Sequence, residues 1–311
     1  MHIRDTQESE PPVYIKLNRV GVKDVKKTII RARDGQYNVL QATISAFIDL
    51  MPTKKGIHMS RNLEVINEII EKTIGPEVED IEILGIAIAK EMLQRQDATM
   101  AEVEIVSNYS LPRITPTLKV KTQENYEIFS RAIAWKTDDG IKVRRRIGMA
   151  VEGMTVCPCS SEAIRDYVEK HFNIDKKLVK ELPLASHNQR GKGTLIVETD
   201  EDYRVEADDL VEIIENSMSS PLYEVLKRQD ELQVVLDASK KPRFVEDVLR
   251  LMLKGIAEKY PTMPENAYII AKQENFESIH RHNAFGEKTG FFSEIKKELE
   301  NNANQNNKNS R

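Results

Sequence analysis

Apolar side chains recur with a helical period in one early part of the chain. In residues 60–74, positions such as Ile66 and Ile70 recur every three or four residues, which is the period of one helix face. Ser60 stands where an N-cap is expected, because its hydroxyl can accept a backbone N–H of the first turn. Residues 78–96 are predicted as a second helix. The sequence therefore places two helices in succession.

Extended segments flank this helix pair on both sides. Segments 12–22 and 38–50 precede it and have the composition of strands. Segments 99–110 and 114–123 follow it, and the first of these alternates only loosely between apolar and polar residues. The predicted order of elements is two strands, two helices and two strands.

The same order recurs in the rest of the chain, although no close sequence repeat accompanies it. The elements predicted there are strands over 126–136 and 142–156, a short helix over 160–172, a strand over 193–199, helices over 208–229 and 241–260, and a strand over 267–277. The helix over 208–229 is expected to break at Ser220 and Pro221. This layout predicts an α+β fold, with antiparallel sheets that carry helix pairs on one face. It lacks the βαβ alternation and glycine-rich turn of a dinucleotide-binding fold.

Four segments follow from this order. Residues 1–11 are predicted as a flexible leader, 12–123 as a first module and 124–290 as a second module that carries most of the candidate site. The polar segment 291–311, which ends in an asparagine-rich run, is predicted to be disordered.

Composition and charge narrow the class of protein. The chain has 311 residues, of which 40% are hydrophobic and 31% charged, and its net charge of -4 arises from 46 basic and 50 acidic residues. This balance gives no electrostatic reason to expect nucleic acid or a membrane surface as a partner. No apolar run approaches the roughly 20 residues that span a bilayer. The first residues lack the apolar core of a secretory signal, so the expected location is the cytoplasm.

Candidate chemistry begins with the only two cysteines, Cys157 and Cys159, which stand one residue apart. Accident, redox chemistry and a metal site are the three explanations. The spacing is not the Cys-x-x-Cys of thioredoxin-like sites, and no second cysteine pair completes a four-cysteine zinc module. Redox chemistry is therefore the least favoured explanation.

The histidines supply partners for a metal site. Of the six in the chain, four lie in dense polar clusters: His58, His187, His280 and His282. Cys157, His187 and His280 could supply one sulfur and two nitrogens to a divalent transition metal, with a carboxylate from "KRQDE" or "FVED". No pair has a recognised metal-binding spacing, so buried thiols and surface histidines remain an equal alternative at this point.

Six short sequence motifs favour the metal site over the alternative of buried thiols and surface histidines. They occur in this order: "KGIHMSR", "CPCSSE", "HNQRGKGT", "LKRQDE", "PRFVEDVLR" and "NFESIHRHNAF". In these strings the chain resembles the archaeal GTP cyclohydrolases that begin methanopterin biosynthesis, the GTP cyclohydrolase IV or MptA family. It is also similar, more distantly, to the bacterial type IB GTP cyclohydrolases of folate synthesis. The resemblance extends from about residue 12 to residue 287.

The resemblance implies a fold and a metal site. The fold is the tunnelling fold, with two ββααββ modules per subunit, and the subunits associate as a homodimer or a dimer of dimers. The implied metal ligands are Cys157, His187, Glu231 and His280. The implied metal is one Fe(II) per subunit, with Zn(II) or Mn(II) as possible substitutes, because cysteine, histidine and glutamate suit several of these ions.

Further roles come from the same resemblance. Glu277 would bind the N1–H and 2-amino edge of guanine, and Glu246 matches an acidic residue near the family's metal. His282 is favoured as proton carrier, since His187 cannot carry protons while it is bound to the metal. Cys159 is either a packed residue at a helix start or a thiol beside the metal. Together with Cys157, the residues Glu246, His282 and Cys159 make up the predicted catalytic set.

The triphosphate of the substrate requires cations. The candidates inside the family strings are His58, Arg61 and Arg190, whereas the neighbouring lysines are expected to be ordinary solvated charges. Asn283 and Gly286 depart from the commoner family residues, an aspartate and an alanine, and concern only the rim of the pocket.

The implied reaction opens the imidazole ring of GTP at C8, releases formate and forms 7,8-dihydroneopterin 2′,3′-cyclic phosphate. A folate-type enzyme would instead end at 7,8-dihydroneopterin triphosphate. The alternatives outside enzymes of this type are a non-catalytic purine or pterin binder that a metal stabilises, and a redox module.

Overall fold

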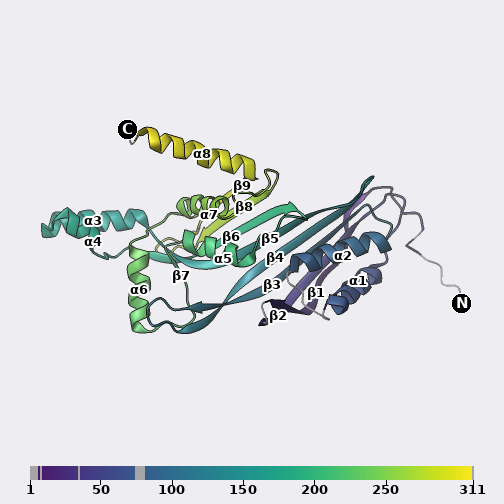
Figure 1. Cartoon of the computed structure of the whole chain (residues 1–311), viewed down its shortest axis with the longest axis horizontal. Coiled ribbons are helices and arrows are strands. Elements are labelled where there is room, and N and C mark those ends of the chain that lie inside the picture. Colours follow the sequence, from purple (N-terminus) through teal and green to yellow (C-terminus); the bar gives the residue numbers. More distant parts are fainter. Residues whose placement is uncertain (1–5, 8, 34–35, 74–80, 310–311) are drawn as a thin grey trace. The chain divides into compact units, whose positions relative to one another are not determined.

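The computed structural model describes residues 6–7, 9–33, 36–73 and 81–309 (Figure 1). Residues 1–5 and 8 of the predicted leader, and the first three residues of the predicted helix 78–96, lie outside these ranges.

The elements of the first half alternate between strand pairs and a helix pair. In order they are β1 (Leu17–Arg33), β2 (Gln36–Leu50), α1 (Met59–Thr73), α2 (Ile81–Arg95), β3 (Met100–Ile114) and β4 (Lys121–Thr137). Those of the second half are β5 (Gly140–Val156), α3 (Pro158–Phe172), α4 (Lys176–Glu181), β6 (Asn188–Asp200), α5 (Ala207–Ser217), β7 (Ser220–Pro221), α6 (Arg228–Ser239), α7 (Val245–Lys259), β8 (Tyr268–Asn275), β9 (Ala284–Phe291) and α8 (Phe292–Asn309).

Within the described ranges, the strands form one nine-stranded sheet in the order β1-β2-β3-β4-β5-β6-β8-β9, with β7 paired to β5. The pairs β1–β2, β2–β3, β5–β7 and β8–β9 are antiparallel. The predicted combination of helices with an antiparallel sheet is therefore confirmed. None of the helices in the described ranges has the length and apolar character that crossing a bilayer requires.

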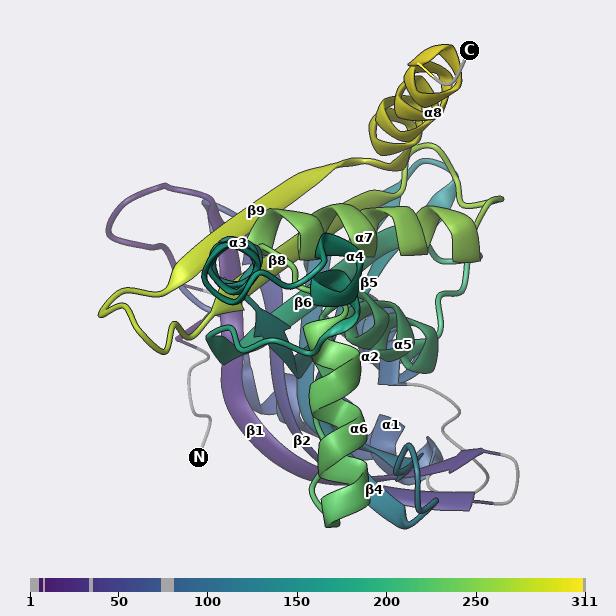
Figure 2. The same cartoon turned by 90° about the vertical axis from the view of Figure 1, so that its left-hand side faces the viewer.

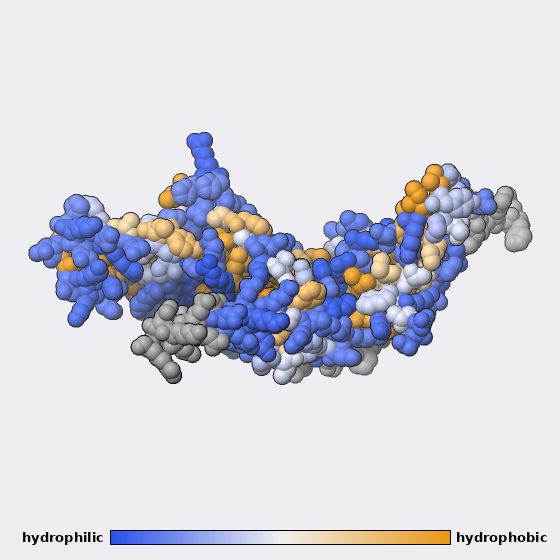
Figure 3. Space-filling view, turned by 90° about the horizontal axis from the view of Figure 1, so that it is seen from above, coloured by the Kyte–Doolittle hydropathy of each residue, from blue (hydrophilic) through white to orange (hydrophobic). Residues whose placement is uncertain are grey.

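The chain forms two compact units. The first consists of residues 1–109, 127–147 and 198–204, and the second of residues 110–126, 148–197 and 205–311. Hydrophilic residues dominate the surface seen in Figure 3, as the share of charged residues leads one to expect.

In the first unit, helices cover one face of the strands and charges occupy the other. Ile66 of α1 and Met92 of α2 are fully buried, as are Val103 and Ile105 of β3. Because side chains alternate along a strand, the residues between these β3 positions point to the opposite face. The first unit therefore has its apolar core on the helix side.

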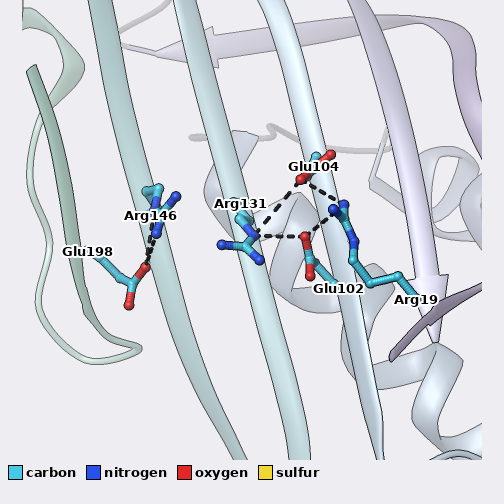
Figure 4. A network of polar contacts seen from close by, with 6 residues as sticks. All are labelled: Arg19, Glu102, Glu104, Arg131, Arg146 and Glu198. Carbon is cyan, nitrogen blue, oxygen red and sulfur yellow. Dashed lines mark hydrogen bonds and ion pairs between the residues drawn. The ribbon is translucent and has the colours of Figure 1, made fainter. Parts of the chain in front are cut away.

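Ion pairs line the opposite face of the first unit (Figure 4). Arg19 of β1 contacts Glu102 and Glu104 of β3, each at 2.9 Å, and Arg131 of β4 contacts Glu102 at 2.8 Å. Glu102 is only 3% exposed. Burial on its own would raise the pKa of Glu102, but the hydrogen bond and charge of Arg131 outweigh it, so that the pKa is lowered. The arginines on this face therefore keep the buried carboxyl group of Glu102 ionised at neutral pH.

In the second unit, α7 packs on β8 and β9 (Figure 2). Val248 and Met252 on its inner face are fully buried. Gly286 of β9 lies directly beneath it, where a Cβ atom would come within 2.6 Å of Leu249 and 2.9 Å of Val245. Helix α7 and strand β9 therefore approach each other very closely at Gly286.

Two residues of the family strings hold this unit together. Arg243 donates to the backbone carbonyls of Asn216 and Ser217 at the end of α5, at 3.2 and 2.9 Å. Burial lowers the pKa of Arg243. The buried carboxylate of Asp230, in the first turn of α6, accepts the backbone N–H of Thr117 and Leu118 at 2.9 and 3.0 Å.

The prediction of a strand over 114–123 is wrong. β3 ends at Ile114, and the chain turns before β4 begins at Lys121. Thr115 donates its N–H to the carbonyl of Val120, which closes the turn, and Asp230 binds the N–H groups within it. Hydrogen bonds from a distant residue therefore fix this segment as a turn, although its composition resembles that of a strand.

Three further expectations are corrected by the structure. β1 begins at Leu17, not at residue 12. The break expected at Ser220 and Pro221 is confirmed, because α5 ends at Ser217 and these two residues pair with β5 as β7. The helix expected to continue to residue 229 is wrong, since α6 begins only at Arg228. The segment expected to be disordered forms α8, whose first turn is anchored by the buried side chains of Phe292 and Ile295.

Replacing Arg131 by leucine is expected to lower the free energy of unfolding at pH 7 by about 1–3 kcal/mol, because the buried Glu102 loses its nearest cation. Folding lowers the pKa of Glu102, so its ion pairs contribute stability above the unfolded pKa of ~4.3 and lose it as the pH falls through the lower folded pKa. The difference from the unmutated protein should therefore shrink in acid. Urea unfolding over a pH series measures it.

The matched control is Lys254→Leu, which removes an exposed ion pair with Glu258. Its effect should stay near zero at every pH. A loss in Arg131→Leu that is the same at pH 7 and in acid would contradict the proposed role of the Glu102 charge.

Candidate functional site

Two family strings meet at neighbouring strand ends in the second unit. Cys157 follows the last residue of β5 and is the N-cap of α3, while His187 precedes the first residue of β6. The backbone N–H of Cys157 donates to the carbonyl of His187 at 3.1 Å. Ser186 donates its hydroxyl to the carbonyl of Cys157 at 2.8 Å. The cysteine and histidine strings are thus joined directly.

The imidazole of His187 is nearly buried and faces two oxygen acceptors. Its Nδ1 lies 3.1 Å from Oε1 of Gln189 and 3.9 Å from Oε2 of Glu277, and its side chain is 12% exposed. Gln189 in turn donates Nε2 to the hydroxyl of Thr155 at 3.0 Å. The ring is therefore in contact with β6 and with the segment that follows β8, and Thr155 of β5 holds Gln189.

The loop after β8 brings two more imidazoles to this point. The ring centroids of His187 and His280 are 6.2 Å apart in an edge-to-face arrangement, and those of His280 and His282 are 5.2 Å apart and stacked. The backbone N–H of Phe276 donates to the carbonyl of Arg190 at 2.9 Å, which ties the start of this loop to β6.

Glu277 is the most unusual group of the cluster that it forms with His187, His280 and His282. Its side chain is 10% exposed, and its Oε2 atom has no hydrogen-bond partner. A buried carboxylate oxygen without a partner carries a desolvation cost that proteins rarely retain without a reason. It can accept N–H groups from a ligand.

Two predicted acidic residues do not join the cluster. Glu231 lies in the first turn of α6 and Glu246 in the first turn of α7, and both are exposed. The neighbouring Asp230 is the buried carboxylate of α6, and it binds the turn before β4. Adjacent helix positions point in different directions, so one of the two acids faces inward and the other faces solvent.

The predicted four-ligand set is therefore only partly brought together. His187 and His280 are neighbours, and Cys157 is one backbone hydrogen bond from His187. Within the ranges that the structure describes, no three histidine, cysteine, aspartate or glutamate side chains lie close enough to hold a metal ion. The chemistry of the donors, one thiolate and two imidazoles, fits iron(II) or zinc(II).

The remaining predicted residues lie on exposed or separate parts of the chain. Cys159 is exposed, so it is not the packed residue that one of the two alternatives required. Arg190 of β6 is 70% exposed and lies 3.5 Å from Glu152. His58 and Arg61 belong to the first unit, where the backbone N–H of Arg61 donates to the carbonyl of His58 at the start of α1.

Thr155 and Gln189 are polar residues of the site that the sequence analysis does not identify. A signal for Gln189 exists in the sequence, because it stands two positions after His187 in a strand-like segment. Residues two apart in a strand share a face.

Comparisons with known proteins agree with the quoted strings. The family model described as type I GTP cyclohydrolase folE2 matches residues 3–286. The chain is 42% identical over 303 residues to the GTP cyclohydrolase MptA of Methanobrevibacter smithii, and the match covers 95% of this chain and 97% of that protein. It is 43% identical to the GTP cyclohydrolase MptA of Methanosphaera stadtmanae over 303 residues, with 94% and 97% covered.

Among solved structures, the uricase from Arthrobacter globiformis is similar with a TM-score of 0.48 and 9% identity. The match covers 88% of this chain and 93% of that one.

The replacement Glu277→Gln is expected to raise the free energy of unfolding by about 1 kcal/mol in the absence of ligand, because it removes a buried charge whose Oε2 has no partner. Thermal unfolding of the two proteins without metal or nucleotide measures the effect. Glu258→Gln, at an exposed position on α7, serves as control and should change nothing. A destabilised Glu277→Gln protein would show that the carboxylate has a stabilising partner after all.

Proposed function

This chain belongs to the family described as type I GTP cyclohydrolase folE2, and on that premise we propose that it is a GTP cyclohydrolase of methanopterin synthesis. Its proposed reaction opens the imidazole ring of GTP at C8, releases formate and forms 7,8-dihydroneopterin 2′,3′-cyclic phosphate. Relatives named GTP cyclohydrolase MptA, similar over almost the whole chain, support the activity, and the product is proposed on the resemblance.

The observation that carries the proposal is the buried, unpartnered carboxylate of Glu277 beside His187 and His280. Guanine presents N1–H and its 2-amino group as two parallel donors on one edge. A carboxylate can accept both, and such charge-assisted pairs fix orientation as well as affinity. Glu277 would thereby hold the base in one orientation and exclude water from that edge.

The proposed metal ligands are Cys157, His187, Glu231 and His280. A bound divalent ion, proposed to be Fe(II) with Zn(II) or Mn(II) as substitutes, would supply a Lewis acid that lowers the pKa of water from ~15.7 towards ~7. The rings of His187 and His280 are in contact. The backbone hydrogen bond from the N–H of Cys157 to the carbonyl of His187 places Cys157 next to them. Glu231 is exposed, and it is the member of the set that the structure supports least.

Proton transfer is proposed for His282. Its ring stacks on His280 at 5.2 Å, and the residue is exposed, so it can exchange protons with solvent. It would deliver a proton to N7 of guanine as the ring opens. Glu246 and Cys159 are kept as further members of the catalytic set on the resemblance alone.

Arg190, His58 and Arg61 are proposed to bind the triphosphate. Arg190 is the best supported of the three, because the carbonyl of this residue accepts the N–H of Phe276, directly before Glu277. Its guanidinium is 70% exposed and contacts Glu152 at 3.5 Å, and on leaving this contact it could pair bidentately with phosphate oxygens, which a lysine cannot do.

The proposed fold is the tunnelling fold with two ββααββ modules. The order β1-β2-α1-α2-β3-β4 has this form, and β5-β6-α5-α7-β8-β9 repeats it once α3, α4, β7 and α6 are set aside. This order favours a module boundary between β4 and β5, at 138–139, over the one predicted at 123–124. Association as a homodimer or a dimer of dimers, and a cytoplasmic location, are proposed on the resemblance.

One assay tests the function. The protein is stripped of metal and incubated without oxygen with GTP and Fe(II), and separately with Zn(II), before mass spectrometry of the products. The cyclic phosphate with formate is the expected result. Dihydroneopterin triphosphate would place the protein in the folate-type branch, and intact GTP from a folded sample would overturn the proposal in favour of a metal-stabilised binder.

In the same assay, Glu277→Gln is expected to lower kcat/KM by about 100-fold, because two charge-assisted hydrogen bonds to guanine are worth about 3 kcal/mol. Its metal content should be that of the unmutated protein. The control is Glu258→Gln, at an exposed position on α7, which should retain activity. Equal activity in both variants would remove Glu277 from the binding site.

Cys157→Ala is expected to abolish both bound metal and turnover, measured by elemental analysis and product formation. Cys159→Ala, two residues away on an exposed position, should retain its metal. Normal metal content in Cys157→Ala would exclude the thiolate from the ligand set.

A further inference from the structure

A buried chain of hydrogen bonds ends on the imidazole of His187. It starts at the hydroxyl of Thr155, which is fully buried, and passes through the amide of Gln189, which is 7% exposed. Nε2 of Gln189 lies 3.0 Å from Oγ1 of Thr155, and Oε1 of Gln189 lies 3.1 Å from Nδ1 of His187. The chain connects β5, β6 and the histidine.

The surroundings of Nδ1 decide which nitrogen of His187 carries the proton. With its NH₂ group directed at Thr155, Gln189 turns its oxygen towards the ring. The second neighbour of Nδ1 is Oε2 of Glu277 at 3.9 Å, which also accepts and cannot donate while it is ionised. Both neighbours favour N–H at Nδ1, and the free lone pair then belongs to Nε2.

The amide of Gln189 is buried, and β6 is closely covered at the next position on the same face. Gly191, the next position on the same face of β6, carries no side chain, and a Cβ atom there would collide with the amides of Gln273 and Asn275. These two amides of β8 are buried, and Gln273 donates to Asn275 at 2.9 Å. β6 and β8 therefore approach each other closely at the position that follows Gln189 on the same face.

We propose that Gln189, held by Thr155, is a positioning residue that fixes His187 as its Nδ1–H tautomer and presents the Nε2 lone pair for metal binding. The inference deepens the proposed function and rests on it for the identity of the bound group. The nitrogen of a histidine that binds a metal is set by the hydrogen bond that the other nitrogen makes. Such outer partners change metal affinity by about 10–100-fold when they are removed.

The first test needs neither metal nor substrate. The protein is labelled with ¹⁵N-histidine, freed of metal and studied by nitrogen–proton correlation NMR about two pH units above the ordinary histidine pKa of ~6.5. The signal of His187 is assigned from the spectrum of His187→Gln. The expected spectrum shows a protonated Nδ1 and an unprotonated Nε2, and a protonated Nε2 would overturn the proposal.

Three variants separate positioning from general stability. Gln189→Leu keeps the size but removes the acceptor, and it should leave His187 as a mixture of tautomers. Gln189→Glu keeps an acceptor towards Nδ1 and should retain the Nδ1–H form. Gln273→Leu is the matched control, a buried glutamine on the neighbouring strand β8 whose amide donates to Asn275, and it should leave the tautomer unchanged.

Competition with a chelator for Zn(II) supplies the second readout. Gln189→Leu should bind the metal about 10–100-fold more weakly, whereas Gln189→Glu and Gln273→Leu should stay within a few-fold of the unmutated protein. Unchanged tautomer and affinity in Gln189→Leu would overturn the proposal. If that variant does not fold, Thr155→Val, which removes the partner of Gln189, takes its place with the same expectation in direction.

Failure of this inference and failure of the proposed function give different results. A protein that holds the Nδ1–H tautomer but binds no metal and leaves GTP intact would support the role of Gln189 and overturn the proposed function. A protein that forms product with metal, yet whose His187 tautomer does not respond to Gln189, would overturn this inference alone.

Discussion

The candidate site depends on one backbone hydrogen bond, from the N–H of Cys157 to the carbonyl of His187. About 30 residues separate the two along the chain, and α3 and α4 lie within that excursion. β5 and β6 are neighbours in the sheet, so the bond closes the excursion at the point where one strand ends and the other begins. Together with the hydroxyl of Ser186 on the carbonyl of Cys157 and the bond from Gln189 to Thr155, it fixes the cysteine string against the histidine string. The two motifs provide the side chains, and the pairing of β5 with β6 in the sheet brings them close together.

The same region holds an unusual density of buried polar groups. Gln189, Gln273 and Asn275 are buried on β6 and β8, and two side-chain oxygens in this area, Oε1 of Gln273 and Oε2 of Glu277, have no partner. Elsewhere in the second unit the inner faces of α5 and α7 are apolar. A core optimised for stability alone would not combine these features. Such local violations of packing rules are expected at functional sites, where binding compensates for the cost.

How far the sequence could predict this structure differs from element to element. α1 and α7 were predictable because their apolar stripes have the helical period and their inner faces are buried as that period requires. The turn before β4 was not, because it is fixed by Asp230, more than 100 residues away. The same residue explains why Glu231 could not be placed by pattern alone. Adjacent acids on α6 look equivalent in sequence, and only the fold shows which one is buried.

The placement of the imidazoles also limits the proton chemistry. With Nδ1 committed to Gln189 and Nε2 assigned to a metal, His187 has no nitrogen left to exchange protons. His280 shares an edge contact with His187 and belongs to the same proposed ligand set. His280 and His282 are both exposed, and of the three clustered rings only His282 lies outside the proposed ligand set. Its proposed role as proton carrier therefore rests on the ligand roles proposed for its neighbours: if Gln189 does not hold His187, Nδ1 of His187 is available for proton exchange as well.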